Sequence, residues 1–122
     1  SCKEIIYRKE VLSRLSVCPR CSFHFRISAR ERLEILCDDG RWEEFDHGLV
    51  SKDPLSFRDT KPYATRLKDS RAKTDSCDAL VSAVGSVGGT HTVLAVMDYG
   101  FIGGSMGVVV GEKVTRCIEK AS

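Results

Sequence analysis

The chain has 122 residues, of which 42% are hydrophobic and 30% are charged, and its formal net charge is +2. This length suits one ordinary domain, or one domain with a small extra module. The composition excludes an intrinsically disordered chain. No apolar run approaches the ~20 residues that a membrane-spanning helix needs, so we expect no membrane partner.

The charge is unevenly distributed along the chain. Residues 1–36 carry eight Lys/Arg against four Asp/Glu, whereas residues 37–122 carry eleven against thirteen. A basic first part suits a surface that meets phosphates, either of nucleic acid or of an anionic cofactor.

Three cysteines near the start have the spacing of a zinc ribbon. Cys18 and Cys21 form a Cys-x-x-Cys pair, and Cys2 lies upstream at the distance that ribbons use. Structural zinc takes four ligands, mostly thiolates and imidazoles, and the fourth cysteine would fall three positions before Cys2. We therefore expect Cys2, Cys18 and Cys21 to hold a structural zinc, and we expect the sequence to be a fragment cut within this site.

The six cysteines also allow a second interpretation, in which they form three disulfides. Cys117 falls on an apolar helical stripe, and Cys37 and Cys77 stand alone in the sequence. The chain has enough apolar residues to form a core that needs no disulfide bonds. A reducing cytosol with a thiolate metal site is therefore the favoured interpretation.

The residues after the cysteine pair predict a strand and then a helix. Phe23, Phe25 and Ile27 alternate with polar residues, as in a half-buried strand. We expect the two aromatic rings to pack behind the metal site, and stacking on nucleic-acid bases is the alternative. Ser28 and Glu31 form a capping box, which predicts a helix to about residue 36 that buries Leu33 and either Leu36 or one of its neighbours.

The middle of the chain resembles a link between two units. Residues 41–60 are predicted to be irregular, with Trp42 and Phe45 as anchors. Pro62 suits the first turn of a helix over about 62–74, and its many charged residues indicate a surface helix.

Residues 78–98 predict a buried antiparallel hairpin that turns at Gly88 and Gly89. Its nearly continuous apolar character predicts burial on both faces. Residues 108–121 then predict a helix, whose apolar stripe is Val110, Val114, Cys117, Ile118 and Ala121. A glycine-rich turn before a helix start suits an anion or developing negative charge.

Residues 103–107 match Gly-x-Ser-x-Gly, the motif around the nucleophile of many hydrolases. Such hydrolases need an acid and a histidine downstream of the serine, and no histidine follows Ser105. We expect Ser105 to cap the helix instead. The phosphate-binding loop motif fails as well, because Glu112 and Val114 interrupt it. The three histidines, His24, His47 and His91, show no catalytic pattern, so no catalytic residue is assigned.

Five stretches of the sequence together resemble one known family. They are residues 2–10, 17–21, 26–33, 52–57 and 103–113. They are similar to the beta subunit of the acetyl-CoA carboxylase carboxyltransferase of bacteria and plastids, and the resemblance covers nearly the whole chain in order.

The resemblance implies a zinc ribbon attached to a crotonase-like spiral domain of the α/β class. It implies three parts: residues 1–36 as the ribbon and capped helix, 37–76 as a linker with a surface helix, and 77–122 as the start of a truncated carboxyltransferase domain. In the family the glycines of the oxyanion hole lie further downstream, so Gly103 and Gly104 are expected only to shape the loop.

The resemblance also implies the reaction and its participants. The family transfers a carboxyl group from carboxybiotin, carried on the biotin carboxyl carrier protein, to acetyl-CoA, and makes malonyl-CoA for fatty acid biosynthesis. The expected partners are a carboxyltransferase alpha subunit in an alpha2beta2 assembly, the carrier protein, and the biotin carboxylase that uses ATP. The expected location is the cytoplasm, or the plastid stroma in a plant. This fragment is expected to be inactive alone.

Two alternatives remain open from the sequence. One is a nucleic-acid-binding zinc ribbon, supported by the basic first part and by Phe23 and Phe25. The other is a different biotin-dependent acyl-CoA carboxyltransferase, for example one acting on propionyl-CoA.

Overall fold

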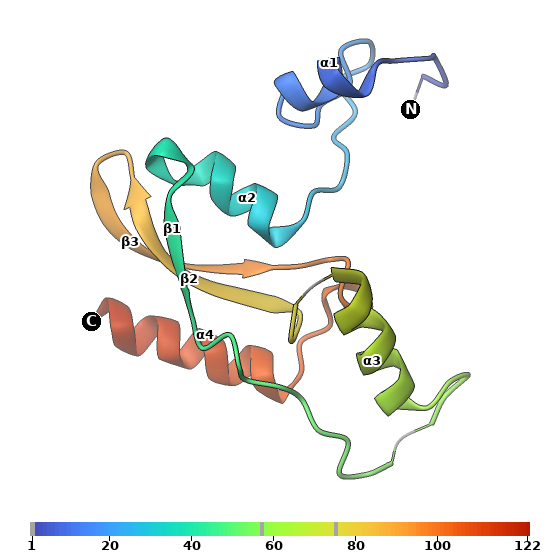
Figure 1. The fold of residues 1–122 in the computed structure, drawn as a ribbon, viewed down its shortest axis with the longest axis vertical. Coiled ribbons are helices and arrows are strands. Elements are labelled where there is room, and N and C mark those ends of the chain that lie inside the picture. Colours follow the sequence, from blue (N-terminus) through green and yellow to red (C-terminus); the bar gives the residue numbers. More distant parts are fainter. Residues whose placement is uncertain (1, 57, 75) are drawn as a thin grey trace.

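The computed structural model describes residues 2–56, 58–74 and 76–122. Its centre is a three-stranded antiparallel sheet of β1 (Trp42–Phe45), β2 (Leu80–Val87) and β3 (Thr90–Met97), in the order β1-β2-β3. Helices cover both faces of this sheet, and the N-terminal cysteine module stands apart from it (Figure 1). The architecture is therefore a small sheet with helices and an N-terminal ribbon.

The predicted hairpin is confirmed. β2 and β3 pair in register from Leu80 opposite Met97 to Val87 opposite Thr90. The two residues of the turn, Gly88 and Gly89, have φ of +58° and +80°. Tight two-residue turns of this hand need positive φ at both central positions, which glycine adopts without steric cost.

The sheet has one strand that the sequence did not predict. β1 pairs with β2, with Trp42 opposite Gly85 and Phe45 opposite Ser82, so the prediction of irregular structure was wrong for these four residues. A four-residue strand shows too little alternation to be recognised without its partner. At Gly85 a Cβ atom would lie 2.7 Å from the sulfur of Cys37, so glycine permits this close approach.

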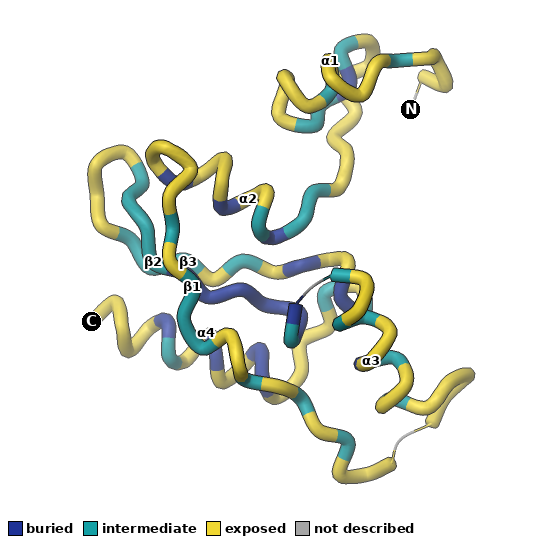
Figure 2. The backbone as a smooth tube through the Cα atoms, in the orientation of Figure 1, coloured by how far each residue is buried: buried dark blue, intermediate teal, exposed yellow. Residues whose placement is uncertain are grey.

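The core has two parts, one on each face of the sheet. On one face, helix α2 (Ala29–Leu36) packs Leu33 against Val81 and Ala83. On the other face, α3 (Tyr63–Thr74) and α4 (Val108–Ala121) enclose the second part, which consists of Leu67, Ala79, Leu80, Phe101 and Val110. The first half of β2 is buried between these layers, as predicted, whereas much of β3 is exposed (Figure 2).

The capping box at the start of α2 is confirmed. The Ser28 hydroxyl accepts from the Glu31 amide, and the Glu31 carboxylate accepts from the Ser28 amide at 2.7 Å. Leu33 is fully buried, as predicted, and Leu36 is 41% exposed while its neighbour Cys37 is buried. Cys37, one residue later, lies in the core in its place because the chain leaves the helix there.

Helix α4 spans the predicted residues, but its start and buried face differ from the prediction. Gly107 is the N-cap residue and no side chain caps the helix, so the prediction that Ser105 caps it was wrong. Val110 and Cys117 are buried as expected, whereas Ile118 is 63% exposed. The buried face of α4 is therefore shifted from the predicted stripe, and its buried residues are Val109, Val110, Lys113 and Cys117.

The N-terminal module contains a short helix, α1 (Arg8–Ser13), where the sequence was ambiguous. The strand predicted over Phe23 to Ile27 does not form; a single bridge joins Val17 and His24 instead. Phe23 and Phe25 are 46% and 40% exposed and pack edge to face on each other, with ring centres 5.3 Å apart.

Two short 3-10 helices, η1 (Asp38–Gly40) and η2 (Ile102–Gly104), complete the described elements, and α3 confirms the predicted polar helix, with Leu67 buried. None of the helices in the described ranges is long and apolar enough to cross a membrane.

Candidate metal centre and adjoining cleft

The three cysteines that the sequence singled out lie together. The sulfurs of Cys2, Cys18 and Cys21 are all within 4.8 Å of one another, and those of Cys2 and Cys18 are 3.9 Å apart. Two thiolates on one tetrahedral zinc would be separated by about 3.8 Å, given zinc–sulfur bonds of ~2.3 Å. All three are free thiols, so the spacing and the donor chemistry both fit a thiophilic metal.

Local backbone geometry brings the pair of cysteines together on one turn. The Cys18 amide donates to the Phe23 carbonyl oxygen at 2.8 Å, and the Ser22 amide donates to the Cys18 carbonyl oxygen at 3.0 Å. Ser22 has φ of +58°, a left-handed conformation that is uncommon for a residue with a side chain. Because Ser22 directly follows Cys21, its conformation turns the Phe23 amide back towards the Cys21 sulfur.

The electrostatics of the cluster differ from one thiol to the next. The pKa of Cys21 is lowered to about 7, first by a hydrogen bond from the Phe23 backbone and then by one from the Cys18 side chain. The pKa of Cys2 is raised: the Glu4 backbone lowers it, but desolvation and the thiols of Cys21 and Cys18 outweigh that effect. Three adjacent thiolates repel one another, and a divalent cation removes that repulsion.

No histidine joins the metal-binding group within the described residues. His24 bridges to Val17 through its backbone, away from a ligand role. His47 has two partners that were not visible in the sequence: its Nδ1 lies 2.8 Å from Glu44 Oε1 and its Nε2 lies 3.8 Å from the Cys77 sulfur. These partners are distant in sequence or carry no recognisable motif, so no local signal indicated them.

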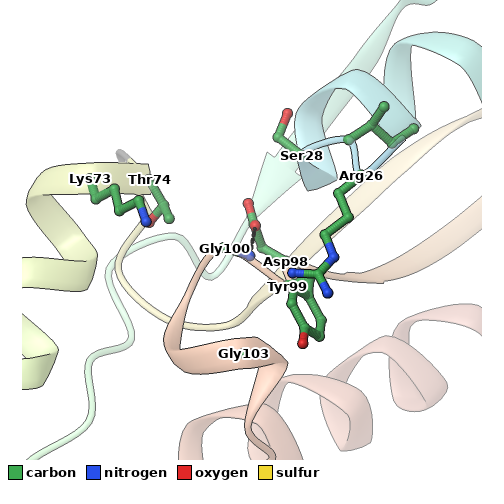
Figure 3. A pocket seen from close by; sticks show the side chains of 9 residues that line it. Arg26, Ser28, Lys73, Thr74, Asp98, Tyr99, Gly100 and Gly103 are labelled. Atoms are coloured by element: carbon green, nitrogen blue, oxygen red, sulfur yellow. Dashed lines mark hydrogen bonds between the residues drawn. The ribbon is translucent and has the colours of Figure 1, made fainter. Parts of the chain in front are cut away.

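A cleft of about 530 Å³ opens where the ribbon joins the rest of the chain (Figure 3). It is formed by the segment that leaves the ribbon, the end of α3 and the loop after β3. Its lining residues are Arg26, Ile27, Ser28, Lys73, Thr74, Asp98, Tyr99, Gly100 and Gly103. The guanidinium of Arg26 stacks over the Tyr99 ring, 4.0 Å from its centre.

Asp98 holds the walls of this cleft in place. It is buried, and its carboxylate accepts from the amides of Gly100 at 2.8 Å and Ala29 at 3.4 Å. These bonds tie the loop after β3 to the first turn of α2. Two cations, Arg26 and Lys73, and one anion, Asp98, line the cleft, so its lining carries a net positive charge, which suits an anionic ligand.

The sequence did not predict this cleft, because its walls come from segments some seventy positions apart. Ser105, which carries the hydrolase-like motif, is exposed and separated from β3 by the loop and η2, so it does not lie on a strand-to-helix elbow. Gly103 lines the cleft with φ of +67°, in agreement with the expectation that it shapes the loop.

Comparison with known proteins shows what this chain is similar to. Residues 1–21 match the family described as the acetyl-CoA carboxylase zinc finger domain. The chain is 49% identical over 121 residues to the acetyl-coenzyme A carboxylase carboxyl transferase subunit beta of Citrifermentans bemidjiense, covering 99% of this chain and 43% of that protein.

Two further relatives carry the same name. The protein of Chlorobaculum tepidum is 47% identical over 99% of this chain and 44% of its own length, and the chloroplastic protein of Pyropia yezoensis is 47% identical over 99% and 42%. The chain thus spans less than half the length of these curated relatives. The resemblance noted in the sequence is confirmed: over almost its whole length, the chain is homologous to beta subunits of the acetyl-CoA carboxylase carboxyltransferase.

Proposed function

We propose that this chain is the ribbon and first part of a beta subunit that transfers a carboxyl group from carboxybiotin to acetyl-CoA, giving malonyl-CoA for fatty acid biosynthesis. The observation that carries the proposal is the 49% identity that extends over 99% of the chain rather than over the ribbon alone. A zinc ribbon borrowed by an unrelated protein would match only over its first residues.

The proposed site organisation has a structural zinc held by Cys2, Cys18 and Cys21, and a crotonase-like carboxyltransferase domain beginning near residue 77. Bound zinc would supply a cross-link for the ribbon rather than a reacting centre, since the ligands that the described residues bring together are all thiolates. The free energy of binding such a metal contributes directly to the folding of a small module.

The cleft beside the ribbon suits the anionic substrate of such an enzyme. Arg26 and Lys73 face it, and Gly100 and Gly103 allow a ligand to approach the backbone. The cleft offers cations and glycine backbone to a ligand, so its proposed role is to bind and orient substrate, with the proton transfer performed elsewhere in the enzyme.

The proposed partners are a carboxyltransferase alpha subunit in an alpha2beta2 assembly, the biotin carboxyl carrier protein, and the biotin carboxylase that uses ATP. The names of the relatives describe a subunit, which supports a multi-subunit enzyme. The proposed location is the cytoplasm, or the plastid stroma in a plant, and a chloroplastic relative supports the second setting.

A segment exchange tests the function directly. The 121 matched residues of the Citrifermentans bemidjiense subunit are replaced by this chain, and the chimera is combined with its alpha subunit, carboxybiotin donor and acetyl-CoA. We expect malonyl-CoA formation within about tenfold of the parent enzyme. An assembled, folded chimera that forms no malonyl-CoA would contradict the proposal.

The metal proposal has its own test, which does not depend on activity. Zinc content is measured for the chain and for Cys21→Ser, with Cys77→Ser as the matched control outside the cluster. We expect zinc in the chain and in the control and its loss in Cys21→Ser; equal zinc in all three would exclude the cluster as the site.

A further inference from the structure

A second group of reactive side chains lies outside the metal cluster and the cleft. It contains Cys77, His47, Glu44 and Arg30, which come from the segment between α3 and β2, the loop after β1, β1 itself and α2. The four form one continuous chain of polar contacts. Neither the homology nor the proposed carboxyl transfer uses them.

The two oxygens of the Glu44 carboxylate have different partners. Oε1 lies 2.8 Å from Nδ1 of His47, and Oε2 accepts from the Arg30 guanidinium at 3.0 Å. The Glu44 side chain is only 14% exposed, so both contacts are partly shielded from water. Arg30 therefore neutralises and fixes the carboxylate that orients the imidazole.

The orientation of the imidazole determines what it offers to Cys77. A carboxylate can only accept a hydrogen bond, so Nδ1 carries the proton in the neutral ring and Nε2 keeps its lone pair. That lone pair faces the Cys77 sulfur at 3.8 Å. A nucleophile, a base and a carboxylate that orients the base form the arrangement by which proteins activate a thiol.

Access separates Cys77 from the other cysteines. Cys37 and Cys117 are buried, and Cys2, Cys18 and Cys21 belong to the metal cluster, whereas Cys77 is partly exposed and the His47 side chain is 52% exposed. A reagent in solution can therefore reach the Cys77 sulfur while the imidazole remains beside it.

We propose that Cys77 is a site of covalent modification by small disulfides, at which His47 acts as the base and Glu44, held by Arg30, positions His47. The Cys77 S–H proton passes to Nε2 of His47, the thiolate attacks one sulfur of the disulfide, and a new S–S bond forms as the old one breaks. The leaving thiolate takes a proton, so a mixed disulfide and one free thiol result.

Other charged groups near Cys77 enter its pH dependence as well. Nε of Arg71, from α3, donates to the Cys77 carbonyl oxygen at 3.2 Å. Asp78 is the next residue, and its carboxylate is engaged by the Ser51 hydroxyl and the Ala79 amide. The test therefore separates the contribution of His47 from these groups by substituting His47 alone.

The experiment uses the full chain and bis(2-hydroxyethyl) disulfide, with iodoacetamide as a second neutral probe, and peptide-resolved mass spectrometry gives the rate at each cysteine. An ordinary thiol is only a few per cent thiolate at neutral pH. We therefore expect Cys77 to react about tenfold faster in the folded chain than in urea at pH 7, and the difference to shrink towards pH 9.

Two variants identify the groups responsible. His47→Gln keeps a polar side chain without the base, and we expect the folded-state advantage at Cys77 to disappear and its pH profile to become that of a simple thiol. Glu44→Gln should lower the rate by a smaller factor. Continued protection of Cys37 and Cys117 in each variant reports that the core is intact.

Equal rates at Cys77 in the folded and unfolded chain would overturn the proposal without any variant. An unchanged rate and pH profile in a folded His47→Gln would overturn the role of His47.

Discussion

The carboxylate of Asp38 accepts a hydrogen bond from the backbone amide of Gly89 at 2.8 Å, and a second from the amide of Gly88 at 3.0 Å. The contact joins the segment after α2 to the turn of the β2–β3 hairpin, fifty positions later. It therefore fixes the hairpin turn, which has no side chains of its own, against the helix layer.

These hydrogen bonds lower the pKa of Asp38, with the Gly89 amide first, then the Gly88 amide and the Ser86 side chain. A carboxyl group with a lowered folded-state pKa stabilises the fold when ionised and loses this contribution as the pH falls through that pKa. Asp38→Asn should therefore lower the thermal midpoint at pH 7, and the difference from the wild type should fade below about pH 4.

The neighbouring exposed residue gives the matched control. Asp39→Asn removes the same charge one position later, so it should leave the melting profile close to that of the wild type at every pH. A pH-independent deficit in Asp38→Asn would show that shape rather than ionisation of Asp38 matters. Thermal melts followed by circular dichroism from pH 3 to pH 8 give the comparison.

Substitution by alanine should affect stability much more at Leu33 than at Leu36. Leu33 has no exposed surface and packs against β2, whereas Leu36 is 41% exposed on the same helix. Leu33→Ala should reduce the free energy of unfolding by about 2–5 kcal/mol, because it removes buried methyl groups and leaves a cavity. Leu36→Ala should change it by about 0.5 kcal/mol or less.

Urea unfolding of the two variants measures the difference. Similar losses in both would mean that Leu36 is buried and not exposed as in the structure. A small loss in Leu33→Ala alone would instead show that α2 does not pack on the sheet.

The features that the sequence predicted correctly depend on neighbours a few residues apart. The Ser28–Glu31 capping box, the Gly88–Gly89 turn and the Cys18–Cys21 pair each carry their own chemistry within four residues. Local hydrogen bonding and φ preference are visible at that range, so the helix, the hairpin and the cysteine cluster could be located in advance.

The features that the sequence missed depend on partners brought together by folding. β1 forms because it pairs with β2, with Trp42 opposite Gly85. The strand predicted from Phe23 is absent, and the Phe23 carbonyl oxygen accepts from the Cys18 amide within the ribbon turn instead. Likewise the cleft needs Arg26 and Tyr99 to meet. No periodicity in a short window records such contacts.

The Ser28 cap predicts a modest and specific loss of stability. Its hydroxyl accepts from the Glu31 amide at 3.2 Å, so Ser28→Ala leaves that amide of the first turn without its partner. We expect a loss of about 1 kcal/mol in the free energy of unfolding, whereas Ser28→Thr, which keeps the hydroxyl, should lose less. Urea titration at pH 7 measures both, and equal losses would contradict a capping role.

The left-handed backbone at Ser22 predicts how the ribbon turn responds to side-chain shape. Ser22 has φ of +58° and precedes the Phe23 amide, whose hydrogen bond is the first cause of the lowered pKa of Cys21. A β-branched residue is strained in this conformation by about 1–2 kcal/mol, whereas glycine is not. Ser22→Val should therefore weaken zinc binding about tenfold, measured by competition with a chromogenic chelator, because each 1.4 kcal/mol changes the affinity tenfold.

Two further variants are the controls for this prediction. Ser22→Gly should bind zinc at least as tightly as the wild type, and Ser13→Val, on the exposed face of α1, should leave the affinity unchanged. Equal affinities for the Val and Gly variants at position 22 would show that this turn does not set the geometry of the thiolates.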